Sequence, residues 1–242
     1  MVEWISKIQV AILGVVLGIC LIVSAVLISN NVSKNEIAVT GTANETVKSD
    51  NAKWSFSVKA VAPTRLESYK KLEDTVPKVK KFLTDNNIKE ENIDLGQMNS
   101  YFEYKINPVT GRTTQEINTY TYEQTFDIKS EDVELVKKLQ LESQSLIEQG
   151  IEIGYSGVDY YYSKLAEKKA ELLSAATLDA KNRAAGMLKA TNNRVGKMRS
   201  VRMGVFQITR PESNDVSDWG INDTSTIEKK VTAVANVVFA IK

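Results

Sequence analysis

The sequence of 242 residues predicts an α+β fold, in which duplicated βαββ units form a mostly antiparallel sheet packed by helices. One N-terminal transmembrane helix is expected to precede this domain. Three observations support this prediction. The chain opens with a long uncharged apolar run, later segments switch between period-two and period-3.6 patterns, and the order strand, helix, strand, strand occurs twice. A hairpin beside a helix in each repeat favours antiparallel pairing.

The apolar run extends from Ile8 to Ile28 and reads "IQVAILGVVLGICLIVSAVLI", with no charged side chain. About 20 apolar residues are enough to cross a bilayer as a helix. Trp4 is placed as an interfacial anchor, and Lys7 is a positive charge of the kind found on the cytoplasmic side. We therefore expect a cytoplasmic N-terminus at 1–7, a membrane anchor at 8–28, and the remainder outside the bacterial cytoplasmic membrane.

A cleaved signal peptide is the alternative, because Val23-Ser24-Ala25 resembles a small-residue cleavage site. The product would then be secreted or periplasmic. The apolar run continues past this site to Ile28, which favours a retained anchor. Cys20, the one cysteine, lies in the run, so the sequence allows no intrachain disulfide and no cysteine metal cluster. A polar linker is expected at 29–36, followed by an exported domain at 37–242, with approximate halves 37–130 and 131–242.

The exported domain opens with "IAVTGTANETVKSDNAKWSFSV" at 37–58. A short strand is expected at 37–40, a turn at Thr42–Asn44, and a long strand at 45–61. No helix is expected directly after Gly41, so the segment lacks the context of a phosphate-binding loop. The second strand is predicted to be half buried, because apolar and polar residues alternate along it. Its buried row comprises Trp54, Phe56, Val58 and Ala60.

A helix is expected at 64–86, where apolar residues recur every three or four positions. They are Leu66, Tyr69, Leu72, Val76, Val79 and Leu83. Pro77 lies within this helix, and an interior proline costs about 3 kcal/mol. We expect either a kink there or a helix that restarts near Thr75.

A hairpin follows, with strands at 95–106 and 116–129 joined by the turn "NPVTGR". Aromatic and aliphatic residues at period-two spacing are more often sheet core than a base-stacking platform, so we expect both rows to be buried. The rows are Met98, Phe102, Tyr104 and Ile106 on the first strand, and Tyr120, Tyr122, Phe126 and Ile128 on the second.

The second half begins with a helix at 131–149 that Gly150 closes as a C-terminal cap. A strand at 151–161 and a long helix at 163–191 follow. The helix has an alanine stripe that allows close packing, comprising Ala166, Ala170, Ala176, Ala180 and Ala184 with Leu173 and Met187. The last strands are expected at 195–208 and 227–241, the final one central because it is apolar on both faces. Between them lies a long loop at 209–226, which is either functional or a flexible tip with a locally packed Trp219.

Several classes of function are excluded by composition. The sequence contains no histidine, which removes Ser-His-Asp and Cys-His catalysis, histidine zinc sites and histidine pH switches. The net charge of +1 gives no electrostatic support for nucleic-acid binding. The segment "GYSG" at 154–157 is not a G-x-S-x-G elbow, and no G-x-G-x-x-G motif or P-loop is present.

The remaining charged pairs are best explained as solvated surface or helix-dipole partners. They are Glu90-Glu91, Glu131-Asp132, Lys168-Lys169 and Lys229-Lys230. We therefore predict no catalytic, cofactor-binding or metal-binding residues, no cofactor, and no enzymatic activity. A carboxylate pair distant in sequence stays an open alternative, though nothing in the sequence singles one out.

Several segments together resemble one family. "IAVTGTANETVKSDNA" at 37–52 is similar to the opening signature of the SIMPL-domain family, which includes bacterial periplasmic immunogenic proteins. "NNIKEENIDLGQMNSYFEY" resembles the segment after its first helix, "LKATNNRVGKMRSV" the strand after its alanine-rich helix, and "VTAVANVVFAI" its closing strand. Asn192-Asn193 departs from the Leu-Gly that is common in the family at this turn.

This resemblance implies an exported α+β domain that associates with copies of itself, in some members as rings or channel-like assemblies. It implies a loose link to envelope or oxidative stress and provides no catalytic residues to transfer. We therefore expect a non-enzymatic protein, anchored through 8–28, that forms a homo-oligomeric ring, cage or channel-like structure. The alternative is an extracytoplasmic binding or chaperone-like module that captures a ligand or client through the 209–226 loop or the lumen of an oligomer.

Overall fold

The computed structural model describes residues 2–32 and 35–242, with side chains at 12–27 and 35–242. The described chain divides into two compact units. The first unit contains residues up to Ala43 together with 172–204 and 233–242, and the second contains 44–171 and 205–232. Two of the predicted linker residues, 33 and 34, lie outside the described part, as do the side chains of 8–11 and 28 in the predicted anchor.

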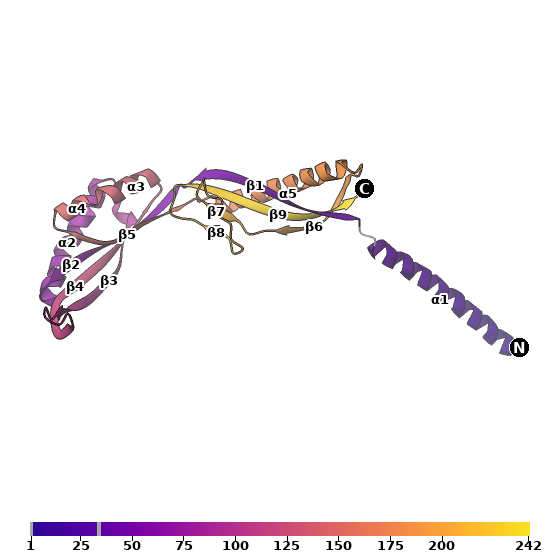
Figure 1. Ribbon diagram of the computed structural model, residues 1–242, viewed down its shortest axis with the longest axis horizontal. Coiled ribbons are helices and arrows are strands. Elements are labelled where there is room, and N and C mark those ends of the chain that lie inside the picture. Colours follow the sequence, from indigo (N-terminus) through magenta and orange to yellow (C-terminus); the bar gives the residue numbers. More distant parts are fainter. Residues whose placement is uncertain (1, 33–34) are drawn as a thin grey trace. The chain divides into compact units, whose positions relative to one another are not determined.

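The described residues form an α+β fold with two sheets (Figure 1). One sheet has the order β3-β4-β2-β5, and the other has the order β1-β9-β7-β8 with β6 also paired to β9. Strand β2 pairs antiparallel with β4 and β5, β3 with β4, and β9 with β6 and β7, whereas β7 and β8 are parallel. The prediction of mostly antiparallel sheet packed by helices is therefore confirmed. The strands are β1 (Glu36–Lys48), β2 (Asn51–Ala62), β3 (Ile93–Ile106), β4 (Thr113–Ser130), β5 (Glu152–Tyr161), β6 (Val195–Met203), β7 (Gln207–Thr209), β8 (Ile221–Asn222) and β9 (Glu228–Ile241).

The helices follow the predicted pattern with different bounds. They are α1 (Val2–Val32), α2 (Arg65–Asp85), η1 (Glu90–Asn92), α3 (Val133–Glu142), α4 (Ser145–Glu148) and α5 (Leu165–Lys189). The helix predicted at 131–149 is therefore split in two, and Gly150 follows it with a φ of 75°, as expected of a C-terminal cap. Within the described ranges, no helix is both long enough and apolar enough to span a membrane.

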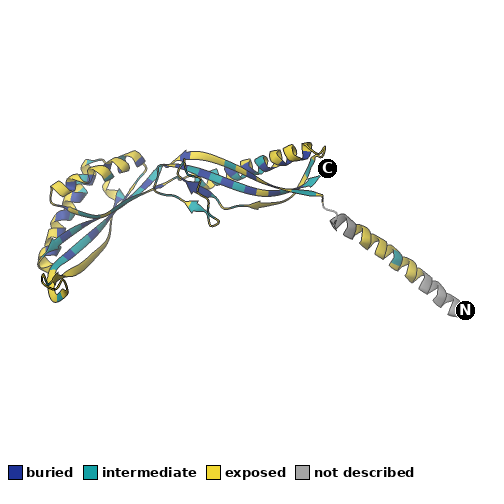
Figure 2. Cartoon of the chain, in the orientation of Figure 1, coloured by how far each residue is buried: buried dark blue, intermediate teal, exposed yellow. Residues whose placement is uncertain are grey.

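The core of the second unit confirms the alternation in β2. Trp54, Phe56, Val58 and Ala60 are all 0% exposed; α2 and α3 pack on β2, and α4 packs on the neighbouring β5. The rings of Trp54 and Phe56 stack with centroids 4.4 Å apart, and Phe56 stacks on Phe126 at 5.2 Å. Figure 2 shows this buried band beneath the helices.

Helix α2 continues through Pro77, so the predicted restart near Thr75 is wrong. Thr64 caps the helix by accepting a hydrogen bond from the Glu67 backbone nitrogen at 3.3 Å. A proline within a helix leaves one carbonyl of the preceding turn without a donor. Both Pro77 and Glu73, the residue four positions earlier, are exposed, so water can satisfy that carbonyl. The buried residues on the opposite side of α2 then hold the helix together.

The predicted turn at Thr42–Asn44 is also wrong, because β1 runs without interruption from Glu36 to Lys48. The reason lies in the first unit, where α5 packs on the strand. A Cβ at Gly41 would lie 2.8 Å from the Cβ of Ala180, and closer still to backbone atoms of Ala176 and Ala180. Gly41 therefore permits close packing of a helix on a strand. The strand ends at Lys48 instead, and Ser49 and Asp50 separate it from β2, which belongs to the other sheet.

The alanine stripe of α5 forms the helix side of the contact with Gly41 on β1. Ala176, Ala180 and Ala184 are 0% exposed and contribute to the core of the first unit. The backbone nitrogen of Thr42 donates to Asp179 on α5 at 2.8 Å, which also holds the strand extended beyond Gly41. Backbone contact of this kind requires small residues on both elements, so the predicted role in close packing is confirmed for these three alanines. It is wrong for Ala166, Ala170 and Met187, the other ends of the predicted stripe, because these residues are exposed.

The hairpin of β3 and β4 has its turn at the predicted position, where the Asn107 backbone nitrogen donates to the Arg112 carbonyl at 2.9 Å and the Asn107 carbonyl accepts from the Gly111 nitrogen at 2.8 Å. Phe126 and Ile128 are buried as predicted, and Tyr120 and Tyr122 are half-buried. The predicted burial of the β3 row is wrong, since Met98, Phe102, Tyr104 and Ile106 are all exposed. The physical reason is position: β3 is the edge strand, while the helices pack on β2, β4 and β5.

The strand predicted at 195–208 is observed as two strands, β6 and β7, separated by three residues. Strand β9 covers most of the predicted final strand and is central as expected, because it pairs with β1, β6 and β7. Its buried row includes Val231, Ala233, Ala235 and Val237. The opposite row is half-buried for most of its length, so the strand is less fully covered than its composition predicts.

Candidate functional site

The largest unpartnered apolar feature of the second unit is a row on β3, which we call the β3 surface. It consists of Leu95, Met98, Phe102, Tyr104 and Ile106, with exposures of 44%, 41%, 42%, 44% and 67%. Phe102 packs edge-on against Tyr104 with ring centroids 5.2 Å apart, and lies 6.3 Å from the ring of Tyr120. Large apolar side chains that cluster in the open usually mark a surface that another molecule covers.

The position of β3 adds backbone groups to this surface. The strand is at one end of the order β3-β4-β2-β5, so one of its sides carries N–H and C=O groups that its own sheet does not pair. Such an edge is a template for another strand, and proteins usually protect it with charge, proline or a covering element. On β3, the apolar row lies beside this edge.

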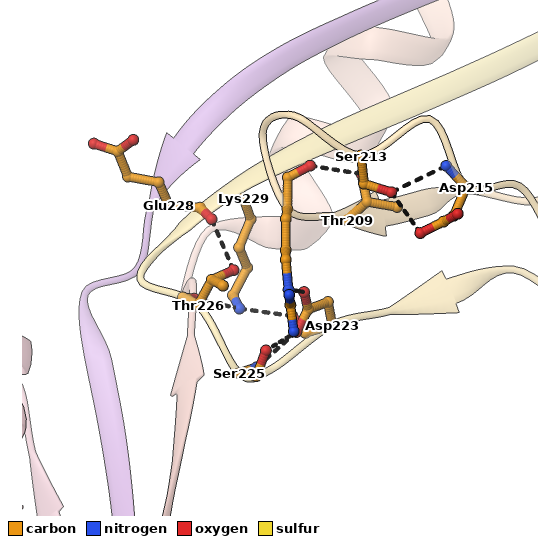
Figure 3. Close-up of polar contacts among 9 residues, drawn as sticks. Thr209, Ser213, Asp215, Asp223, Ser225, Thr226, Glu228 and Lys229 are labelled. Atoms are coloured by element: carbon orange, nitrogen blue, oxygen red, sulfur yellow. Dashed lines mark hydrogen bonds and ion pairs between the residues drawn. The ribbon is translucent and has the colours of Figure 1, made fainter.

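The second candidate is the 209–226 loop, which is held by polar contacts (Figure 3). The Gln207 side chain donates to the Ser217 carbonyl at 2.7 Å and accepts from its nitrogen at 3.3 Å. Lys230 donates to the Ser213 carbonyl at 2.5 Å. Trp219 is 95% exposed, so the expectation of a locally packed tryptophan is wrong. The hydrogen bonds from Gln207 and Lys230 fix the loop, and the Trp219 ring projects from it into solvent.

Lys229 provides the strongest of these anchors, and the prediction that it is solvated is wrong. The residue is 4% exposed, and its ammonium group donates to the carbonyls of Asp223 at 2.6 Å and Thr226 at 2.7 Å (Figure 3). Burial lowers the pKa of Lys229, against the attraction of nearby carboxylates. Burial alone would raise the pKa of Asp223, but hydrogen bonds from Ser225 outweigh it and lower that pKa.

A groove of ≈ 610 Å³ lies near the end of this loop, within the second unit. Its apolar lining includes Val158, Tyr160 and Ile227, and Lys48 pairs across its rim with Glu134 at 2.9 Å. Burial raises the pKa of the Tyr160 hydroxyl. The groove combines an apolar floor with one ion pair, which suits a small amphipathic ligand better than a reaction that needs an activated nucleophile.

The carboxylates that the sequence offered for chemistry have structural partners or lie on the surface. Asp132 caps α3 by accepting from the Leu135 nitrogen at 2.9 Å, and Glu90 begins η1. Lys168 pairs with Glu45 at 3.0 Å and with Glu171 at 2.7 Å, and hydrogen bonds to these carboxylates raise its pKa. Over the described part of the chain, no group of three or more His, Cys, Asp or Glu residues is arranged to hold a metal ion.

Sequence reasoning therefore missed the β3 surface and the Lys229 anchor. For β3, the sequence signal was its place in a hairpin. When a hairpin lies at the end of a sheet, one of its two strands is an edge strand, and helices that cover the middle of the sheet leave that strand exposed. For Lys229, the signal was its place in an apolar alternating strand, where position 229 shares a face with Val231 and Ala233.

Comparison with known protein families identifies the family of this chain. The family model described as "SIMPL: Protein of unknown function (DUF541)" matches residues 37–239. No curated protein matches the sequence. The match starts at the first residue of the "IAVTGTANETVKSDNA" signature and extends into β9, so it includes both the β3 surface and the 209–226 loop. On this match, the chain belongs to the SIMPL family.

Proposed function

We propose that this protein is a non-enzymatic, membrane-anchored SIMPL protein that assembles with copies of itself on the extracytoplasmic face of a bacterial membrane. The assembly is a ring, cage or channel-like structure that serves the envelope or stress response, as the family resemblance implies. The observation that carries the proposal is the β3 surface, where Phe102 and its neighbours stay 41–67% exposed along an edge strand.

An edge strand and an apolar row together favour a protein partner. A second strand placed against β3 would satisfy its free backbone groups, and the same step would cover part of the apolar row. Strand β3 has 14 residues and β4 has 18, well above the usual length of about 5–6 residues. A long edge offers enough contact for copies of the chain to associate through this strand.

Support for the anchor comes from the sequence of α1 and from its exposure. The helix has 31 residues, which at about 1.5 Å per residue exceeds the ~30 Å hydrocarbon core of a bilayer. Its described apolar side chains are exposed, including Leu21 at 70% and Ile22 at 66%, so they need a covering that lipid would supply. Lys7 favours a cytoplasmic N-terminus. Cleavage near Ala25 would instead leave a periplasmic or secreted protein.

The duplicated βαββ arrangement is part of the same proposal. Strand β2, helix α2 and strands β3 and β4 follow one another in the first half. Strand β5, helix α5 and strands β6 and β9 follow the same order in the second, with the short β7 and β8 inserted in the loop. A duplicated unit has two hairpins, and each places exposed apolar residues on an edge strand: the 14-residue β3, and the 9-residue β6 with Met198, Val201 and Met203. The β3 edge is the longer of the two.

The mass of the full chain in detergent tests the assembly. We expect light scattering to give a multiple of the 26.9 kDa chain mass, and Phe102→Lys to lower that multiple because it places a charge in the β3 surface. Leu178→Lys is the matched control: Leu178 is 58% exposed on α5 and lies outside this surface. Circular dichroism should show both variants folded. A monomeric wild type, or Leu178→Lys alone disrupting the assembly, would overturn the proposal.

A second function, as a binding or chaperone-like module, is favoured by Trp219, which projects 95% exposed from the anchored loop. Deleting the loop would also remove the partners of Lys229, so Trp219→Ala is the cleaner test. If the loop captures unfolded clients, the full chain should reduce light scattering from heat-denatured citrate synthase, and Trp219→Ala should weaken that effect. Equal scattering curves for wild type and Trp219→Ala would remove the loop from this function.

A further inference from the structure

The four-stranded sheet of the second unit has a polar face opposite the helices. Along β2 the buried row of Trp54 and Phe56 alternates with Lys53, Ser55, Ser57 and Lys59, which point the other way. Paired positions on β4 continue this face with Asp127 opposite Ser55 and Glu123 opposite Lys59. Neither self-assembly through β3 nor the 209–226 loop makes use of this face.

The "GYSG" segment at 154–157 crosses this face at a β-bulge. The register between β2 and β5 shifts between Phe56 and Val58, so an extra residue is accommodated on β5 around Tyr155. Bulges of this kind redirect a side chain. The Tyr155 backbone nitrogen donates to Ser57 Oγ at 3.1 Å, and its side chain is 66% exposed. The bulge therefore holds an exposed aromatic ring on a sheet face that is mostly polar and whose other exposed ring is Tyr101, 40% exposed beside Lys59.

The two glycines of the segment make room for this arrangement. A Cβ at Gly157 would lie 2.8 Å from Cζ of Tyr155 and even closer to its hydroxyl group, so the ring rests against the bare backbone of Gly157. A Cβ at Gly154 would lie 2.5 Å from Ser57 Oγ and 2.7 Å from Cε of Lys59. The absence of a Cβ at Gly154 thus leaves space for the Lys59 side chain, and its absence at Gly157 leaves space for the Tyr155 ring.

The charges around the ring nearly balance, with two lysines facing three carboxylates. Lys53 pairs with Asp127 at 3.1 Å, and Ser55 donates to the same carboxylate at 2.5 Å. Lys59 is attracted by Tyr101 and by the carboxylates of Glu123 and Glu152, which raise its pKa. The surface thus offers many hydrogen-bond donors and acceptors with little excess charge. This combination does not favour a strongly charged ligand of either sign.

We propose that this face binds a chain of neutral pyranose sugars, with Tyr155 as the stacking platform. A pyranose ring presents C–H bonds on its flat side, which suit the apolar body of a tyrosine ring, and hydroxyl groups around its edge. Those hydroxyls both donate and accept, so they can add hydrogen bonds to the half-exposed Lys53 and Lys59 and to the carboxylates beside them. An extended sugar chain can lie along a sheet face without a deep pocket. The proposal does not depend on self-assembly or on the 209–226 loop.

The test measures binding of two probes, cellohexaose and chitohexaose, to the full chain by saturation-transfer NMR and calorimetry. The detergent must lack a sugar headgroup, which would compete. We expect wild type to bind at least one probe, and Tyr155→Ala to weaken binding about tenfold. Gly157→Val should do the same while keeping the tyrosine, because its Cβ occupies the place of the ring. Trp219→Ala, which removes an even more exposed ring elsewhere, should leave affinity unchanged.

Circular dichroism melting curves establish that each variant is folded before its affinity is compared. The proposal is overturned if wild type binds neither hexasaccharide, or if Tyr155→Ala binds as tightly as wild type. It is equally overturned if Trp219→Ala causes the same loss, since the effect would then not belong to this face. Binding of polyphosphate in place of the sugars would show that charge, not stacking, governs recognition.

Discussion

Gly41→Ala is the sharpest test of how the first unit is packed. Gly41 belongs to the "VTG" signature at the start of the domain, in the middle of β1. A methyl group there would lie 2.8 Å from the Cβ of Ala180, whereas two carbon atoms prefer about 3.5–4.0 Å. Backbone atoms of Ala176 and Ala180 would be closer still. Backbone cannot rotate away as a side chain can, so helix α5 must retreat.

The required retreat is about 1 Å, and a gap of ~0.5–1 Å already forfeits a quarter to a half of the dispersion energy of the atoms that face it. Ala176, Ala180 and Ala184 are 0% exposed and would all lose contacts on the strand. Overpacking typically costs 1–3 kcal/mol, so we expect Gly41→Ala to lower the free energy of unfolding by about 3 kcal/mol.

Urea titration of the full chain, followed by circular dichroism, measures this loss. Gly186→Ala is the matched control, because Gly186 is an exposed residue of α5 with no atom within 4 Å of a Cβ built on it. The same substitution there should raise stability by about 0.5–1 kcal/mol, since alanine is the better helix former. If Gly41→Ala unfolds at the same urea concentration as wild type, α5 does not pack on β1 as argued.

Three further predictions concern the second unit. The pKa of Asp127 is held low by the hydrogen bond from Ser55 and by nearby lysines, so its contribution to stability is present above about pH 4 and is lost as the pH falls through its folded-state pKa. Urea titrations at a series of acidic pH values should show this loss, and Ser55→Ala should make it smaller. Lys229→Met leaves two loop carbonyls without their donor, so we expect a cost of about 1–3 kcal/mol, and hydrogen exchange should show faster exchange in the 209–226 loop. Gly150→Ala should cost about 1 kcal/mol in the same urea assay, because Gly150 has a φ of 75°.

Local sequence patterns were sufficient to predict the buried rows of β2 and α2 and the turn of the β3 hairpin in the second unit. The alternation from Trp54 to Ala60 identified the buried row of β2, and the spacing of Leu72, Val79 and Leu83 identified the buried side of α2. The turn of the β3 hairpin followed from its Pro and Gly. Each of these features depends on neighbours within a few residues, so the sequence contains the necessary information.

The errors share a different cause, which is contact between residues distant in the chain. Gly41 and the hydroxyl residues after it are typical of a turn, and the helix that forces an extended conformation lies more than 130 residues further on. Thr42 is hydrogen-bonded to Asp179, a partner that local periodicity cannot supply. The alanine stripe indicated close packing but did not identify the strand on which the helix packs.

The candidate surfaces were hard to predict for a related reason. Period-two spacing shows that Met98 and Phe102 share a side of β3, but not whether a helix covers that side. The same limitation applies to Lys229, whose burial follows from carbonyls in the neighbouring loop. For "GYSG", the sequence excluded a catalytic elbow, whereas the bulge that exposes Tyr155 depends on pairing with β2.

The two proposals for the second unit concern opposite faces of one sheet, and this makes them separable. Phe102 lies opposite Tyr120, in the row that continues to the buried Phe126 on the side of the helices. Tyr155 rests on Gly157, which pairs with Ser55 on the polar face. Phe102→Lys should therefore change the mass of the assembly without changing sugar affinity, and Tyr155→Ala should do the reverse. If either variant altered both, the two faces would not act independently, and the assignment of one role to each would fail.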